Sequence, residues 1–197
     1  MTDVPGAASP VSPGRRRVGF FGGSFDPPHV GHVLAVAYVL AVHPVDEVLV
    51  VPVFAHPFAK RTAAFAERME MCRRAFGWLP GVTVSDVEAR LGGESLTLRT
   101  LEALVAEQPD LDLRLIIGSD VVGDLPKWHR FDRIAEIAPP LVLARAGVAG
   151  DHGAEVLPRV SSTEVREALA SGDHERIAPL VPRAVLEHIQ ARRLYAS

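Results

Sequence analysis

The chain has 197 residues, of which 48% are apolar and 23% are charged, and its formal net charge is −3. This balance is typical of a globular protein with one well-buried core, and it excludes a fibrous chain or one that is disordered throughout. The small negative charge excludes a general attraction to nucleic acid or to an anionic membrane, so we expect neither as a partner and expect any bound anion to meet a local cluster of donors.

The first seventeen residues contain three prolines and end in Arg15-Arg16-Arg17, without the long apolar run of a secretory signal. We interpret residues 1–17 as a flexible tail with solvated arginines and residues 18–197 as a single domain. The lone cysteine, Cys72, excludes an internal disulfide and indicates a reducing, cytoplasmic location.

Short apolar runs then alternate with segments of helical spacing. Buried strands are predicted over residues 18–21, 48–53, 113–117 and 141–144, and a weaker strand over 82–85. Helices are predicted over 30–43, 65–76 and 97–107, from near residue 162, and around 185–194. Because strands covered on both faces are usually parallel, we predict an α/β fold: a Rossmann-like open parallel sheet with helices on both faces and further helices at the C-terminal end.

The segment GGSFDPPHVGH, residues 22–32, follows the first predicted strand directly. Gly22 and Gly23 remove side chains where strand turns to helix, which lets backbone N–H groups approach a phosphate. His29 and His32 stand three apart at a helix start, so both imidazoles lie on one face and can donate to phosphate oxygens, more strongly if protonated.

Other interpretations of this segment carry less weight. Either histidine alone would be interpreted as a cap or a core residue, but the pair after a glycine turn favours phosphate binding. A zinc site would need further ligands, for which Asp26 is the only local candidate, so we predict no protein-held metal. The lysine and hydroxyl residue of a P-loop are missing.

A second segment, VSSTEVR over residues 160–166, places Ser161, Ser162 and Thr163 at a predicted helix start and Arg166 one turn later. Hydroxyl side chains, free N–H groups and an arginine together form an anion site in outline. An ordinary helix cap is the competing interpretation, and only the pairing with the histidine segment favours function.

The two segments resemble the HxGH and SSTxxR motifs of the nucleotidyltransferase α/β phosphodiesterase superfamily. Within it, the chain is most similar to nicotinate mononucleotide adenylyltransferases. The similarity spans roughly residues 18–194 and includes Val51-Pro52, the segment SLTLRTL over 95–101, Gly118-Ser119-Asp120, and Pro126-Lys127-Trp128.

The resemblance implies transfer of AMP from ATP to a pyridine mononucleotide, with Mg²⁺ held by the ATP phosphates and water. It implies catalytic roles for His29, His32 and Arg166. It implies ATP contacts from Gly22, Gly23, Ser24, Phe25, Gly118, Asp120, Ser161, Ser162 and Thr163. It implies substrate contacts from His56, Lys60, Thr97 and Trp128, although Trp128 could also be a core residue, and Asp120 and Thr97 could merely begin helices.

Three departures from the family pattern leave the acceptor open. Leu96 replaces a common tyrosine, His129 stands where an aromatic residue is frequent, and residues 53–60 lack the usual PPHK form. Nicotinamide mononucleotide, phosphopantetheine or another phosphorylated acceptor, and a nucleotide-binding module without turnover, stay as alternatives. The oligomeric state is not predicted.

Overall fold

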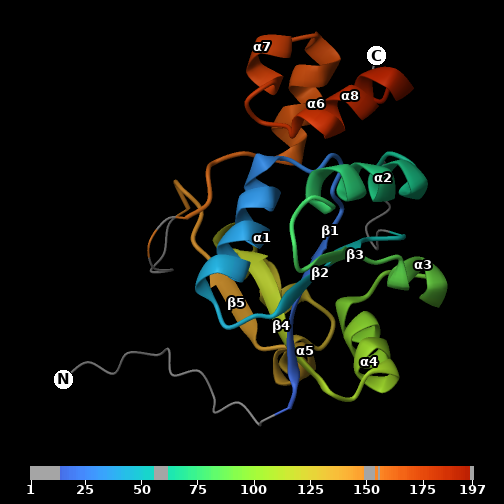
Figure 1. Cartoon of the computed structure of the whole chain (residues 1–197), viewed down its shortest axis with the longest axis vertical. Helices are drawn as coiled ribbons and strands as arrows, with labels where there is room; N and C mark the ends of the chain where they lie inside the picture. The colour runs from blue at the N-terminus through green and yellow to red at the C-terminus, as the bar shows by residue number, and fades with distance from the viewer. Residues whose placement is uncertain (1–13, 56–61, 149–153, 155, 196–197) are drawn as a thin grey trace.

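The structure is a computed structural model that describes residues 14–55, 62–148, 154 and 156–195. Within these ranges one sheet of five parallel strands runs in the order β3-β2-β1-β4-β5 (Figure 1). The strands are β1 (Arg16–Gly23), β2 (Glu47–Pro52), β3 (Val82–Val84), β4 (Leu111–Gly118) and β5 (Pro140–Leu143). The predicted fold class is confirmed.

The longer helices lie where the helical spacing predicted them, and four short ones were not predicted. The predicted helices are α1 (Val30–Val42), α2 (Phe65–Phe76), α4 (Thr97–Glu107), α6 (Ser162–Ser171) and α8 (Arg183–Arg192). The others are α3 (Val87–Leu91), the 3-10 helix η1 (Ser119–Lys127), α5 (Phe131–Ile137) and α7 (His174–Ile177). Three of these span seven residues or fewer, too few for an apolar period to show, and η1 does not follow the α-helical period.

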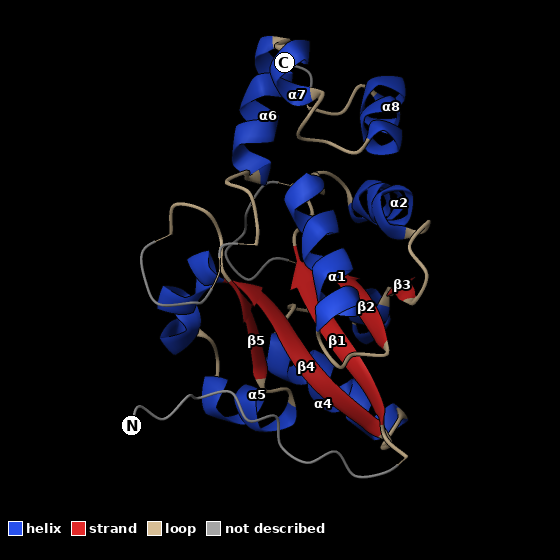
Figure 2. Cartoon of the chain, turned by 60° about the vertical axis from the view of Figure 1, so that its left-hand side comes forward, coloured by secondary structure: helices blue, strands red, loops and turns tan. Residues whose placement is uncertain are grey.

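Successive side chains of the central strands enter two different cores, because side chains alternate across a sheet. Phe21 and Ile116 pack with α1, α2 and the C-terminal helices, whereas Phe20 and Leu115 pack with α4 and α5 on the opposite face. Figure 2 shows α1 in front of the sheet and α4 behind it. The continuous apolar runs of the sequence reflect this burial on both faces.

The strand order places the ends of β1 and β4 at the centre of the molecule. From β1 the chain moves outward through β2 to β3 and then returns to β4 on the other side of β1, so the carboxyl ends of β1 and β4 form the topological switch point of the sheet. Ligands of open α/β sheets bind at such points. Gly23 ends β1 and Gly118 ends β4.

The C-terminal helices α6, α7 and α8 lie together at one end of the molecule, beside α2 and the start of α1 (Figure 1). Glu67 of α2 joins α8 to the rest of the fold. Its carboxylate lies 2.7 Å from Nε2 of His188 and accepts hydrogen bonds from Arg192 at 2.7 and 3.0 Å. These contacts hold α8 against α2.

The first strand begins two residues earlier than the sequence predicted. Arg16 and Arg17 belong to β1 rather than to a tail, and both make ion pairs instead of being merely solvated. Arg17 binds Asp46 through its guanidinium at 3.0 Å, and Arg16 lies 3.3 Å from Glu47. Residues 1–13 of the predicted tail lie outside the described residues.

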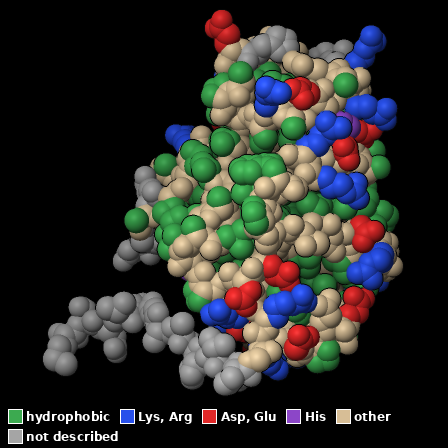
Figure 3. Space-filling model, in the orientation of Figure 1, with side chains coloured by type: hydrophobic (Ala, Val, Ile, Leu, Met, Phe, Trp, Pro, Cys, Tyr) green, Lys and Arg blue, Asp and Glu red, His purple; other side chains and the backbone are tan. Residues whose placement is uncertain are grey.

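Surface charge is mixed on the face shown in Figure 3, where basic and acidic side chains lie interspersed around apolar ones. In the described part of the chain, no helix has the length and apolar character that crossing a bilayer requires.

Candidate active site

The two histidines of the HxGH motif lie stacked at the start of α1. His29 is the N-cap residue, and its ring centroid lies 3.7 Å from that of His32, with 22° between the ring planes. The backbone N–H of His29 donates to Nδ1 of His32 at 3.1 Å. Nδ1 therefore carries no proton, so neutral His32 is protonated on Nε2 and can donate from that atom.

We expect both imidazoles to be neutral near pH 7. Burial, and then the charge of Arg145, lower the pKa of His29 from 6.5 to about 3. Burial, His29 and Arg145 lower the pKa of His32 well below its usual value. The pair was predicted to donate more strongly when protonated, and a bound phosphate would have to raise the pKa of both imidazoles before they could donate in that form.

We expect the depressed pKa of His29 to make folding sensitive to mild acid. Since the folded pKa of about 3 lies below the unfolded value of 6.5, the unfolded chain binds the proton first. Stability is therefore lost as the pH falls through 6.5, by about 1.4 kcal/mol between pH 7.5 and 5.5 for this one group.

Urea unfolding at the two pH values measures this loss. The His29→Asn variant should lose about 1.4 kcal/mol less than the wild-type chain over the same interval. Equal losses in both proteins would contradict the assignment to His29.

Gly31, between the two histidines, is required by packing. A Cβ atom there would lie 2.9 Å from Cγ1 of Val160 and 3.2 Å from the ring of His29. Val160 is buried and precedes the SSTxxR motif directly. The glycine of the first motif thus makes room for the second.

Gly31→Ala is accordingly expected to destabilise the protein by about 1–3 kcal/mol, the usual cost of overpacking. Without the clash, the higher helix propensity of alanine would stabilise α1 by about 1 kcal/mol. The sign of the change in the free energy of unfolding therefore shows whether the clash is present. In urea unfolding, Gly31→Ala combined with Val160→Ala should cost clearly less than the sum of the two single changes.

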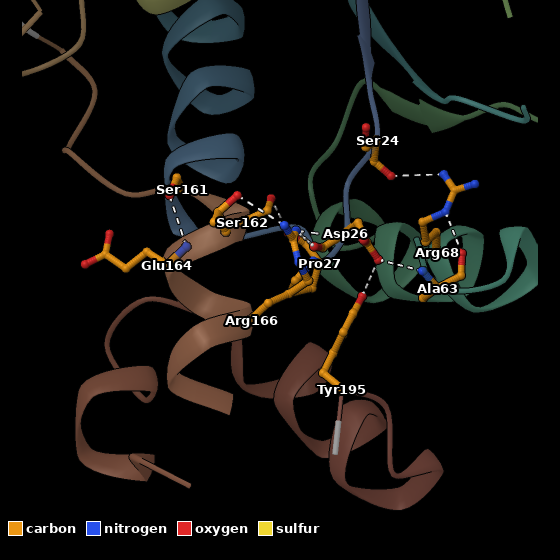
Figure 4. A network of polar contacts seen from close by, with 11 residues as sticks. Ser24, Asp26, Pro27, Ala63, Arg68, Ser161, Ser162, Glu164, Arg166 and Tyr195 are labelled. Atoms are coloured by element: carbon orange, nitrogen blue, oxygen red, sulfur yellow. Dashed lines mark hydrogen bonds and ion pairs between the residues drawn. The ribbon is translucent and has the colours of Figure 1, made fainter. Parts of the chain in front are cut away.

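The two motifs meet in space, which the sequence could not show. Ser162 donates its hydroxyl to the carbonyl oxygen of Pro27 at 2.9 Å, and Arg166 donates to that of Asp26 at 2.6 Å (Figure 4). Ser161 caps α6 by accepting the N–H of Glu164 at 3.2 Å. Ser161 therefore caps the helix, while its neighbour Ser162 contacts the first motif.

A cavity of about 210 Å³ lies at the switch point of the sheet. Six of the predicted site residues line it: Gly22, Gly23, His32, Gly118, Asp120 and Trp128. A side chain at Gly118 would displace the carboxylate of Asp120, because a Cβ atom there would meet Oδ1 of Asp120, which turns back over the strand end. Trp128 presents its ring beside Phe131, edge-on at 6.4 Å.

Arg145 lines the same cavity and was not singled out from the sequence. Its Nε atom lies 3.1 Å from Oδ1 of Asp120, and Nη1 donates to the carbonyl oxygen of Val160 at 2.6 Å. Its backbone N–H donates to the hydroxyl of Ser119 at 3.0 Å, which ties the end of β5 to that of β4. The sequence did offer one indication of this residue, because Arg145 directly follows the strand predicted over 141–144.

Several predicted contacts lie away from this cavity. His29 is buried behind His32, with 2% of its surface exposed. Phe25 is also buried and packs edge-on against His32 at 5.1 Å, so its side chain belongs to the core. Ser24 accepts a hydrogen bond from Arg68 through its carbonyl oxygen at 3.0 Å. Arg166 lines a second cavity with Asp26, and Thr163 accepts from Arg166 at 3.1 Å.

The predicted substrate segments adjoin each other. The hydroxyl of Ser95 accepts the backbone N–H groups of Phe54 and Ala55 at 3.0 and 3.1 Å, so the loop after β2 lies beside the start of α4, where Thr97 is half-buried. His56 and Lys60 lie outside the described residues. The described residues contain no group of three or more His, Cys, Asp or Glu side chains that could hold a metal.

Comparison with known proteins identifies the class that this fold and site define. Residues 20–168 match the model of the cytidylyltransferase-like family. A protein of Plasmodium falciparum, described as a nicotinic acid mononucleotide adenylyltransferase complexed with NaAD, has the same fold, with a TM-score of 0.80 at 18% identity over 91% of this chain and 97% of that one.

Two relatives specify the family more narrowly. The "Probable nicotinate-nucleotide adenylyltransferase" of Anaeromyxobacter dehalogenans is 45% identical, over 92% of this chain and 98% of the relative. The protein of that name from Myxococcus xanthus is 41% identical, over 91% and 94%. The chain therefore belongs to the nicotinate-nucleotide adenylyltransferase family.

Proposed function

We propose that the chain transfers AMP from ATP to nicotinate mononucleotide, which yields nicotinic acid adenine dinucleotide and pyrophosphate for NAD synthesis. Family membership supports this reaction, and one observation supports its location: His32, Asp120, Arg145 and Trp128 line a single cavity at the switch point of the sheet.

In the proposed reaction, an oxygen of the mononucleotide phosphate attacks the α-phosphorus of ATP while the bond to the β-phosphate oxygen breaks. The nucleophile is already ionised near neutral pH, so the protein needs no strong base and acts through alignment and charge stabilisation. Mg²⁺ held by the ATP phosphates would supply positive charge there.

His32 and Arg145 are proposed to bind the reacting phosphates. Nε2–H of His32 is oriented as a donor by the hydrogen bond that Nδ1 accepts, and Arg145 supplies a fixed positive charge in the same cavity. His29 supports His32 by stacking and through its backbone N–H group. A direct contact of the His29 ring with phosphate stays a prediction.

The second motif is proposed to hold the β- and γ-phosphates. Ser161, Ser162 and Thr163 lie at the start of α6, where free N–H groups and the helix dipole favour an anion. Arg166 stands one turn further along and contacts the first motif through Asp26. Gly22, Gly23, Ser24, Phe25, Gly118 and Asp120 stay the proposed nucleotide contacts. His56, Lys60, Thr97 and Trp128 stay the proposed contacts to the pyridine mononucleotide.

One assay tests the reaction and the acceptor together. The purified chain is incubated with ATP, Mg²⁺ and either nicotinate mononucleotide, nicotinamide mononucleotide or phosphopantetheine, and pyrophosphate release and product mass are measured. We expect the product of nicotinate mononucleotide to form fastest. Absence of pyrophosphate with every acceptor would contradict the proposed reaction, and a faster second acceptor would reassign the substrate.

A further inference from the structure

Asp26 is a buried carboxylate in the loop that joins β1 to the histidine pair, with 1% of its surface exposed. Its Oδ1 atom accepts hydrogen bonds from the hydroxyl of Tyr195 at 2.7 Å and from the backbone N–H of Ala63 at 3.0 Å. Figure 4 shows these donors converging on Asp26 from separate parts of the chain.

The other carboxylate oxygen of Asp26 is oriented toward Arg166. Among the described residues, Oδ2 has no hydrogen-bond partner, and Nη1 of Arg166 lies 3.8 Å away. The same Nη1 donates to the backbone carbonyl of Asp26 at 2.6 Å. Arg166 is thus held beside the carboxylate without a close ion pair between the two side chains.

The chain after α8 folds back to bring Tyr195 to this carboxylate. Arg193 and Tyr195 have positive φ angles of 51° and 62°, which are unfavourable for residues other than glycine. Burial and the hydrogen bond to Asp26 raise the pKa of Tyr195 far above its usual range. The phenol therefore stays protonated and remains a donor to Asp26 at neutral pH.

Removal of this donor would leave the buried carboxylate with fewer hydrogen bonds. A carboxylate that loses a donor binds its neighbouring cations more strongly when little of its surface is open to water, and only 1% of Asp26 is exposed. Two cations lie near Asp26: Arg68, whose guanidinium is already held by the carbonyl oxygens of Ala63 and Ser24 at 2.9 and 3.0 Å, and Arg166. The expected result is therefore a closer Asp26–Arg166 ion pair. An incoming triphosphate would then have to break that pair before it could bind Arg166.

We propose that Tyr195 is a positioning residue for ATP binding: its hydroxyl engages Asp26 so that the guanidinium of Arg166 stays available to phosphate. The proposal rests on the proposed function, in which Arg166 binds the triphosphate of ATP.

The Tyr195→Phe variant of the full chain tests this role. Calorimetric titration with ATP and Mg²⁺ should show a Kd about tenfold higher than that of the wild type. KM for ATP should rise similarly, while KM for nicotinate mononucleotide stays within about twofold. Tyr38→Phe is the matched control, because it removes the hydroxyl of the only other tyrosine, which lies on α1 beside His43, and it should leave both constants unchanged.

A second variant tests whether Tyr195 acts through the charge of Asp26. In an Asp26→Asn background the neutral amide cannot draw in Arg166 by charge, so Tyr195→Phe should change the Kd for ATP less than twofold. A tenfold effect in that background would overturn the proposal. So would an unchanged Kd, or an equal loss of affinity for ATP and mononucleotide, in Tyr195→Phe alone.

The calorimetric titrations also separate the role proposed for Tyr195 from the proposed function. A wild-type chain that binds ATP but releases no pyrophosphate would contradict the proposed function, and the affinities of the variants would still test Tyr195.

Discussion

The His32→Ala variant is expected to turn over about a thousandfold more slowly than the wild type. Removal of one oriented hydrogen-bond donor to the charge that develops in the transition state typically lowers the rate by about 10²–10³. Nε2 of His32 is such a donor, since Nδ1 is occupied by the N–H of His29. The residue lines the cavity rather than filling the core, so the melting temperature should fall by only a few degrees.

Two further variants make this result specific. His32→Gln places an amide N–H in a similar position and should recover part of the lost turnover. His43→Ala removes the histidine at the opposite end of α1 and should leave turnover within about twofold. Near-normal turnover in His32→Ala, or loss of its folded state, would favour a core role for this histidine.

Arg145→Ala has the second large expected effect, a loss of kcat/KM of about a hundredfold, because the cavity loses its fixed positive charge. The same charge helps to hold down the pKa of His29 and His32. Its removal should therefore raise the pKa of both histidines, which NMR titration of the imidazole protons can follow.

Conservative and distant variants provide the controls. Arg145→Lys keeps the charge but not the planar group that contacts both Asp120 and Val160, so kcat/KM should recover in part while the histidine pKa values stay low. Arg114→Ala removes an arginine that pairs with Asp112 within β4, and it should leave kcat/KM unchanged. If the two alanine variants lost activity equally, a specific role for Arg145 would be contradicted.

The sequence predicted the elements well where burial imposes a pattern. Strands covered on both faces, such as β1 and β4, are continuous apolar runs, and the five longer helices have helical spacing. Both motifs were found because their residue types are unusual in combination. The start of β1 was predicted at residue 18 instead of Arg16, because charged residues at a strand end resemble a solvated tail.

The arrangement of the site could be predicted only in part. No sequence spacing indicates that Ser162 contacts Pro27 or that Tyr195 contacts Asp26, because these pairs are separated by 135 and 169 residues. The neutral state of the histidines depends on burial and on Arg145, which the fold supplies. Phe25 was predicted among the nucleotide contacts because it lies inside the motif, yet its ring packs into the core.

These long separations also bear on synthesis of the protein. The loop before α1 is made early, but its partners Ser162, Arg166 and Tyr195 follow 135, 140 and 169 residues after the residues they contact. Contacts so distant along the chain form late, because a large loop must close first. We therefore expect a nascent chain on the ribosome to acquire its sheet before its nucleotide site, and to become active only after Tyr195 has emerged.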